Sequence, residues 1–293
     1  LRVAGVAAPA PMFIAEPNHP EYSFTNPKVV SRFFARPELA PDLAGETGFF
    51  HTERPPEGIR LVVQGGSSAA GFPYGYGASL AGMLEQRLRR RYPDRPVEVI
   101  TTAMSAVNTW ALADFADDIV ELDPDAVLIY AGHNEFLGIF GVGSVYSASS
   151  SPALTRWLLR LRQLRLYRVL EALLAREPPA ESGAGTLMAR IAGEKRIPYE
   201  SPLFARGQAH SEGNLGRILG RYRSAGIPVY VATLASNERD QPPFESTDPA
   251  RESADWKSAR HAFEAGQWEN AAEGFAALTE AYPDSATYAW FLA

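Results

Sequence analysis

The sequence predicts an α/β protein in which a parallel β-sheet is covered by helices on both faces and is followed by a helical appendage. Between residues 59 and 234, short apolar runs rich in β-branched residues alternate with stretches of helical periodicity. Strands that are apolar throughout are typical of parallel sheets, because both faces of such sheets are buried. From about residue 251, small alanines and large aromatic residues recur at the spacing of packed helix pairs.

The α/β domain is expected over residues 58–250. Its strands are predicted at residues 59–63, 97–102, 126–131 and 229–234. Its helices are predicted to begin near Tyr76 and to cover residues 110–122 and 210–224. Ligands of parallel sheets bind at the carboxyl ends of the strands, so we expect the functional site at that edge.

Residues 1–57 precede this pattern and combine many prolines and polar residues with scattered aromatics. Their helix or strand periodicity is poor. Because disordered segments contain few aromatic residues, we expect an extended N-terminal arm that packs its aromatic side chains onto the α/β domain.

An insertion over about residues 138–209 separates the third and fourth predicted strands. It begins with a Gly/Ser-rich stretch, residues 141–151, that predicts a mobile loop. An amphipathic helix follows from Pro152 to about Ala175, with leucines among five arginines. Such a helix can lie on an anionic membrane surface, although a solvated basic face is the commoner explanation. Residues 177–200 are predicted to be loop.

Residues 251–293 predict two helices and the start of a third, separated by Gly266-Gln267 and Tyr282-Pro283-Asp284. The pattern is typical of a tetratricopeptide-type repeat, with a core formed by Trp256, Trp268 and Trp290. Repeat units need neighbours to bury their faces, so these helices are candidates for contact with a protein partner.

The composition excludes several classes of function. The 293 residues carry a net charge of -6, which argues against a general nucleic-acid binder. The absence of cysteine excludes disulfides, cysteine-based metal sites and a cysteine nucleophile. Four of the five histidines, namely His19, His51, His210 and His261, are scattered singly and lack metal-ligand spacing. We expect each of these four to be a surface or capping residue, and we predict neither metal nor cofactor.

A pair of serines follows the first predicted strand, in the sequence Gly65-Gly66-Ser67-Ser68. In α/β proteins a nucleophilic serine often lies between a strand that ends in a glycine turn and the helix that follows, because the glycines allow a sharp turn. Taken alone, such a Gly/Ser cluster more often just connects a strand to a helix.

Three segments taken together resemble the sequence blocks of SGNH/GDSL hydrolases. GGSS, residues 65–68, resembles the first block, with Ser67 at the nucleophile position. TTAMSA, residues 101–106, resembles the second block, with Ala103 where the family usually has glycine. GHNE, residues 132–135, resembles the third block, with Asn134 as its asparagine.

The likeness is greatest to bacterial SGNH-like proteins that carry tetratricopeptide repeats, in which a segment like SNERDQPPF, residues 236–244, also recurs. The resemblance implies a flavodoxin-like fold and a serine ester hydrolase, acting on an acetyl or other acyl ester of a glycan or a lipid. Ser67 would attack the carbonyl carbon. The resemblance implies that the Ser67 N–H, the Ala103 N–H and the Asn134 amide hold the oxyanion.

The resemblance also assigns neighbouring roles. Gly66, Gly132 and His133 would line the substrate site, with His133 positioning or packing rather than taking a proton. Glu135, the last residue of the third block, is expected to be a structural hydrogen-bonding partner rather than an acid catalyst.

The family takes its base from a D-x-x-H segment after the last strand, and the C-terminal part of this sequence contains none. The fifth parallel strand of the fold is missing as well. We therefore expect the chain to be the front portion of a longer protein that supplies the base. Relatives usually carry a membrane helix followed by an arginine, which would make Leu1-Arg2 the start of a periplasmic or otherwise extracytoplasmic, membrane-anchored domain.

Two alternatives remain open. Ala103 and the missing histidine favour a catalytically inactive SGNH-like scaffold that uses its repeat for protein contacts. A nucleotide-binding α/β protein has little support, because residues 65–71 match neither phosphate-loop nor dinucleotide spacing.

Overall fold

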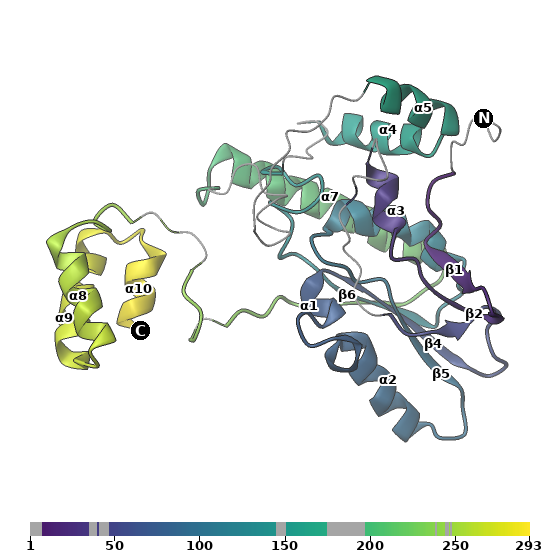
Figure 1. The fold of residues 1–293 in the computed structure, drawn as a ribbon, viewed down its shortest axis with the longest axis horizontal. Coiled ribbons are helices and arrows are strands. Elements are labelled where there is room, and N and C mark those ends of the chain that lie inside the picture. The colour runs from purple at the N-terminus through teal and green to yellow at the C-terminus, as the bar shows by residue number, and fades with distance from the viewer. Residues whose placement is uncertain are drawn as a thin grey trace. The chain divides into compact units, whose positions relative to one another are not determined.

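The computed structural model describes residues 8–34, 40, 47–144, 151–174, 197–237, 239–243, 246 and 248–293 (Figure 1). The chain divides into two compact units, Leu1–Leu234 and Ala235–Ala293, whereas the sequence pattern changes at about residue 251. Most of the Gly/Ser-rich stretch and of the predicted 177–200 loop lies outside the described residues, as do residues 238 and 244 of the SNERDQPPF segment.

The first unit is built on a parallel sheet with the strand order β5-β4-β6-β7. Its strands are β4 (Ile59–Gly65), β5 (Val97–Thr101), β6 (Ala126–Tyr130) and β7 (Val229–Val231). In register, Val62 lies opposite Ile100 on one side and Val127 on the other. The four predicted strands are thus confirmed, although β7 ends before the predicted residue 234.

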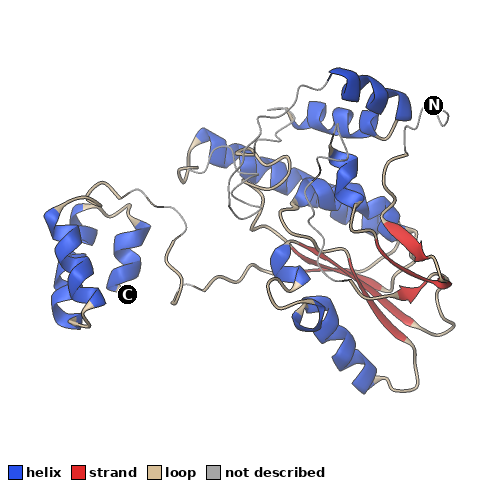
Figure 2. Ribbon diagram, viewed as in Figure 1, coloured by secondary structure: helices blue, strands red, loops and turns tan. Residues whose placement is uncertain are grey.

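Helices cover both faces of this sheet (Figures 1 and 2). On one face α2 (Leu80–Arg91) packs Leu80, Leu84 and Leu88 against a cluster that contains Val63. On the other face α3 (Thr109–Val120) and α7 (Pro202–Ser224) share a core with Val62. Neighbouring residues of β4 therefore serve opposite cores, which confirms the predicted α/β class with a sheet flanked by helices.

The N-terminal part forms a sheet of its own, which the sequence did not predict. Strands β1 (Phe13–Glu16), β2 (His19–Thr25) and β3 (Phe50–His51) pair antiparallel in that order, and a 3-10 helix, η1 (Val29–Phe33), follows β2. The expectation of a merely extended arm is therefore wrong. Its aromatic residues do reach the core, since Phe33 and Phe50 are buried in the same cluster as Val62.

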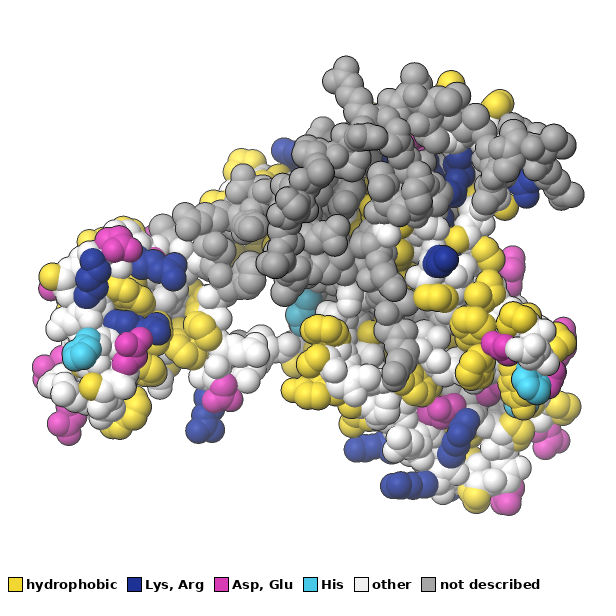
Figure 3. All heavy atoms as spheres, viewed as in Figure 1, with side chains coloured by type: hydrophobic (Ala, Val, Ile, Leu, Met, Phe, Trp, Pro, Cys, Tyr) yellow, Lys and Arg dark blue, Asp and Glu magenta, His cyan; other side chains and the backbone are white. Residues whose placement is uncertain are grey.

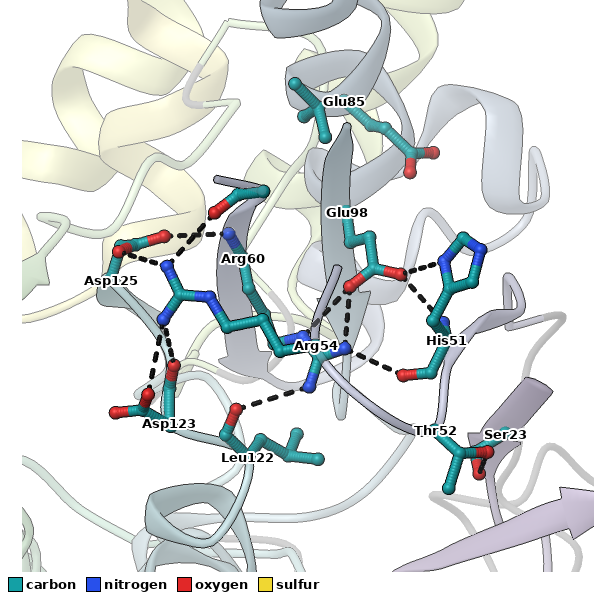
Figure 4. Close-up of polar contacts among 12 residues, drawn as sticks. Ser23, His51, Thr52, Arg54, Arg60, Glu85, Glu98, Leu122, Asp123 and Asp125 are labelled. Atoms are coloured by element: carbon teal, nitrogen blue, oxygen red, sulfur yellow. Dashed lines mark hydrogen bonds and ion pairs between the residues drawn. The ribbon is translucent and has the colours of Figure 1, made fainter. Parts of the chain in front are cut away.

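A buried ion pair joins the N-terminal sheet to the central sheet (Figure 4). The Arg60 side chain is only 2% exposed and donates from Nε to Glu98 Oε2 at 2.9 Å. The other oxygen of Glu98 accepts from the His51 backbone N–H at 2.7 Å, and Arg60 Nη2 donates to the His51 carbonyl oxygen at 2.7 Å. The network holds β3 against the amino ends of β4 and β5.

Two predicted helices differ from the structure. The helix expected over residues 152–175 is a pair, α4 (Pro152–Arg162) and α5 (Arg165–Leu174), separated at Gln163-Leu164. The helix expected over residues 210–224 begins earlier, at Pro202, with Ser201 capping its first turn. Within the described residues, no helix is both long enough and apolar enough to cross a membrane.

The second unit consists of α8 (Ala254–Glu264), α9 (Trp268–Ala281) and α10 (Ala286–Leu292) around a core that includes Trp256 and Phe275. Gly266, with φ of 70°, provides the left-handed turn between α8 and α9. Trp268 is 65% exposed and so is not part of the core, contrary to expectation. The helices are where the sequence predicts them, and their assignment to the tetratricopeptide type stays a prediction.

Candidate active site

The three sequence blocks meet at one edge of the central sheet. Strands β4, β5 and β6 are parallel and end at Gly65, Thr101 and Tyr130, so the residues that follow them emerge on the same side. From β4 the chain passes first to β5 on one side and later to β6 on the other. The crevice at such a reversal of strand order is where open α/β sheets bind ligands.

Ser67 begins the short helix α1 (Ser67–Ala70) directly after β4, with Gly66 as the N-cap residue. The turn depends on Gly65, because a Cβ atom there would lie 2.2 Å from the Tyr130 carbonyl oxygen. Ser67 is partly exposed, and its hydroxyl has no hydrogen-bond partner among the described residues. The hydroxyl is therefore available to a ligand, as is that of the more exposed Ser68.

Asn134 lies beside this turn. Its buried side chain donates from Nδ2 to the Val107 carbonyl oxygen at 2.9 Å, and a Cβ atom on Gly66 would stand 2.8 Å from the same nitrogen. A side-chain amide has two N–H groups, and the bond to Val107 uses one. The structure thus brings Asn134 next to Gly66 and leaves one donor for a ligand bound near Ser67.

The backbone N–H of Ala103 already has an acceptor, the Thr101 hydroxyl oxygen at 3.3 Å. Ala103 is buried and its φ is not positive, so alanine fits there without strain. The residue in the glycine-favouring conformation is Ala106, with φ of 57°. Among the described residues the Ala106 N–H donates no hydrogen bond, whereas its carbonyl oxygen accepts from the Ile139 N–H at 3.0 Å.

The sequence did not indicate that Ala106 has a positive φ and a backbone N–H without an acceptor among the described residues. The TTAMSA segment contains two alanines, and nothing in an alanine side chain tells which of them has a positive φ. The available signal was the expected glycine, which the resemblance placed at Ala103.

Gly132 and His133 follow β6 at the same edge. Gly132 has φ of 148°, and a Cβ atom there would lie 2.6 Å from Leu234 Cδ1, so both backbone and space favour glycine. The exposed His133 ring stands edge-to-face with Tyr130 at a centroid distance of 5.5 Å. Their predicted role in lining the substrate site, together with that of Gly66, remains a prediction.

Glu135 anchors the third block to α3. Its buried carboxylate accepts from the Thr109 backbone N–H at 3.0 Å and from the Thr109 hydroxyl at 2.7 Å, at the first residue of that helix. Burial raises the pKa of Glu135, and the two bonds from Thr109 offset part of this effect. The expected structural role of Glu135 agrees with these contacts.

No histidine in the described part of the chain, which includes His19, His51, His133, His210 and His261, hydrogen-bonds to Ser67. His51 Nδ1 lies 2.7 Å from Glu98 at the amino ends of the strands (Figure 4), whereas Ser67 follows the carboxyl end of β4. His210 is buried in α7 with its ring 5.5 Å from Trp110, so the expectation of a surface residue is wrong there. The described residues also contain no group of three or more potential ligands placed to hold a metal ion.

Residues that the structure describes in the first unit line cavities of about 580 and 450 Å³. The larger lies between α3, α4 and α7, and the smaller lies beside His51 and Glu98. Neither is lined by Ser67, Ala103 or Asn134.

No family model matches the chain, and no curated protein does. Among solved structures, AlinE4, an SGNH-hydrolase family esterase, is 17% identical over 72% of this chain and 97% of its own, with a TM-score of 0.34. TesA is 12% identical over 75% of this chain and 73% of its own, with a TM-score of 0.33. The acetyl xylan esterase AlAXEase is 12% identical over 59% of this chain and 77% of its own, with a TM-score of 0.30. Likenesses this weak establish neither family nor activity.

Proposed function

We propose that the protein is a serine ester hydrolase of the SGNH type with Ser67 as nucleophile. The observation that carries the proposal is the Asn134 amide beside Gly66, one residue before Ser67, at the carboxyl edge shared by β4 and β6. A partly exposed hydroxyl without a protein partner, next to a fixed amide donor, suits attack on a carbonyl carbon and stabilisation of the oxygen anion that forms.

In the proposed reaction the Ser67 Oγ bonds to the acyl carbon, and the carbonyl oxygen becomes an oxyanion. The proton of Ser67 passes to a base and then to the leaving alcohol when the carbon–oxygen bond of the ester breaks. Water hydrolyses the resulting acyl-enzyme. Each preorganised donor to the oxyanion contributes about 2.7–4 kcal/mol to stabilisation of the transition state.

The donors proposed are the free N–H of Asn134, the backbone N–H of Ser67 and one alanine N–H from the second block. The resemblance points to Ala103, whose N–H would have to give up its bond to Thr101. We favour Ala106, because its N–H has no acceptor among the described residues and its backbone has the conformation of a glycine.

The remaining parts of the proposal rest on the resemblance alone. They are an acyl ester substrate, such as an acetyl group on a glycan or a lipid, a base from a D-x-x-H segment that is not assigned in this chain, and a periplasmic or extracytoplasmic, membrane-anchored location.

The test is hydrolysis of p-nitrophenyl acetate by the full-length natural protein, its Ser67→Ala variant and its Ser68→Ala variant. Ser68 is the matched control, because it is the adjacent and more exposed serine of the same helix. We expect the wild type and Ser68→Ala to release nitrophenol at similar rates and Ser67→Ala to fall to the background rate. Equal activity of Ser67→Ala and wild type would contradict the proposal.

A catalytically inactive scaffold is the second candidate, because none of the five histidines hydrogen-bonds to Ser67. In that role the helices α8–α10 would contact a protein partner. A full-length protein that folds cooperatively yet hydrolyses no acyl ester would support it.

A further inference from the structure

The α4–α5 hairpin, residues 151–174, exposes an unusual share of large apolar side chains. Five of them are 44–69% exposed, namely Leu154, Trp157, Leu164, Leu166 and Leu170. Residues three or four apart share a helix face, so each helix presents an apolar pair to the outside. Figure 3 shows hydrophobic side chains, in yellow, at the outer edge of the molecule where Figure 1 places α5.

The opposite face of the hairpin fixes it to the first unit. Thr155 is buried, and Leu159 packs against the core. Arg162 donates from Nη2 to Glu171 at 2.6 Å, which joins the two helices, and from Nη1 to the Phe33 carbonyl oxygen at 2.6 Å. The exposed apolar side chains are therefore held outward by a specific set of contacts.

The hairpin is also strongly basic. It contains five arginines and one glutamate, a formal charge of +4 in a chain whose net charge is -6. Arg162 is paired with that glutamate, and Arg168 is buried. Arg156 and Arg160 form no ion pair with any residue that the structure describes.

Arg217 of α7 adds a third guanidinium to Arg156 and Arg160. All three line the cavity of about 580 Å³, and Arg217 has only a weak 3.5 Å bond to Asn214. Burial, and then the charges of Arg156 and Arg160, lower the pKa of Arg217, as expected where like charges converge.

Acidic residues of α3 line the same cavity but do not neutralise these arginines by ion pairing. Asp114 and Asp118 accept from Arg32, and Asp117 accepts from Arg221. Glu121 also lines the cavity, so its acidic and basic side chains are equal in number, but Arg156, Arg160 and Arg217 form no ion pair with a carboxylate that the structure describes.

We propose that the α4–α5 hairpin and Arg217 form a docking surface for an anionic phospholipid bilayer. The exposed leucines and Trp157 would enter the boundary between headgroups and acyl chains, and Arg156, Arg160 and Arg217 would bind lipid phosphates. Short helices with Trp and Leu beside arginines bind membranes in this way. Guanidinium groups suit the surface because they bind phosphate through two parallel hydrogen bonds. This surface does not depend on esterase activity.

The experiment is flotation of the protein with vesicles of phosphatidylcholine alone and of phosphatidylcholine mixed with phosphatidylglycerol. We expect binding to the anionic vesicles at about 0.1 M salt and its loss at about 1 M salt, as the Debye length falls from about 10 Å to about 3 Å. Failure to float with anionic vesicles, or equal binding to both vesicle types, would overturn the proposal.

Variants separate the two parts of the surface. Each arginine near an anionic bilayer adds about fivefold to binding, so Arg156→Gln/Arg160→Gln should weaken it about 25-fold. The matched control is Arg87→Gln/Arg90→Gln, which removes two exposed arginines from α2 on the other face of the sheet. Equal effects of the two pairs would show that only net charge matters and would refute the site.

The apolar part is tested by Leu166→Gln/Leu170→Gln, with Met83→Gln on α2 as the control. We expect the hairpin variant to lose vesicle binding and the control to keep it, while both unfold at the wild-type temperature. A concentration-dependent dimer that this variant abolishes, without vesicle binding by the wild type, would assign the face to a second copy instead.

Discussion

The side-chain nitrogen of Asn134 lies 2.8 Å from the point where a Cβ atom on Gly66 would stand. Two loops that follow different strands, β4 and β6, meet at this contact, and it leaves room for glycine alone. The bond from Asn134 to the Val107 carbonyl oxygen, at 2.9 Å, fixes the amide there. The candidate oxyanion donor is thus positioned by the protein before any substrate binds.

Replacing Asn134 by alanine should reduce kcat/KM for an acetyl ester by about 10²–10³, because the lost donor acts on charge that develops only in the transition state. The reduction should appear in kcat. Loss of the bond to Val107 should lower the free energy of unfolding by about 1 kcal/mol, measured by urea denaturation. A change in KM with kcat intact would contradict the assigned role.

Gly66 and Gly65 should respond differently to substitution by alanine. In Gly66→Ala the new methyl group meets the Asn134 amide, so we expect lower kcat/KM from a protein that still folds. In Gly65→Ala it would stand 2.2 Å from the Tyr130 carbonyl oxygen, a backbone atom of the neighbouring strand. That variant should lose about 1–3 kcal/mol of stability. Thermal unfolding and ester hydrolysis of both variants give the comparison, and similar results for the two would count against it.

The pH dependence of stability should report on Glu135. Burial raises its pKa in the folded protein above 4.5, so the folded state binds this proton more tightly than the unfolded state. Its contribution to the free energy of unfolding is complete below pH 4.5 and is lost as the pH rises through the folded pKa. Urea denaturation over about pH 4–8 should show this decline in the wild type and in the exposed control Glu121→Gln, and a smaller decline in Glu135→Gln, because burial also raises the pKa of Asp114. The same dependence of unfolding free energy on pH in the wild type and both variants would contradict the raised pKa of Glu135.

The buried ion pair between Arg60 and Glu98 should contribute more to stability than the exposed ion pair between Arg54 and Asp123. Glu98→Ala leaves the Arg60 guanidinium, 2% exposed, without its carboxylate and should cost about 3–5 kcal/mol of stability. The carboxylate of Asp123, which pairs with Arg54, is 87% exposed. Asp123→Asn weakens this pair and should lower the free energy of unfolding by less than about 1 kcal/mol. Chemical denaturation of the two variants tests the contrast, which similar losses would refute.

The central sheet could be predicted from the sequence because its strands are short apolar runs, rich in β-branched residues, without the three-to-four-residue spacing of an amphipathic helix. It missed β1–β3, since a segment such as HPEYSFT has polar residues and proline and forms a strand by pairing with β1 and with β3, which lies further along the chain. It also missed the break between α4 and α5, because leucines and arginines continue through it without glycine or proline. Arg162 stabilises the arrangement of the two helices by bonding to Glu171 of α5 and to the Phe33 carbonyl oxygen, and these contacts form only in the tertiary fold.

For the candidate site, the resemblance of three segments to known sequence blocks pointed to Ser67 and Asn134, and the structure places Asn134 beside the turn that carries Ser67. An alanine side chain does not indicate the backbone conformation of its residue, so the positive φ of Ala106 could not be predicted. The bond from Ala103 to the Thr101 hydroxyl depends likewise on a local turn that the residue types do not specify.

The most direct test of Ser67 as an activated nucleophile is labelling of the full-length natural protein with a fluorophosphonate, followed by mass spectrometry of the modified peptide. We predict a single adduct on Ser67 that is absent from Ser67→Ala and retained in Ser68→Ala. A folded protein that takes no label, or that takes it on Ser68, would contradict the assignment and leave the inactive scaffold as the better explanation.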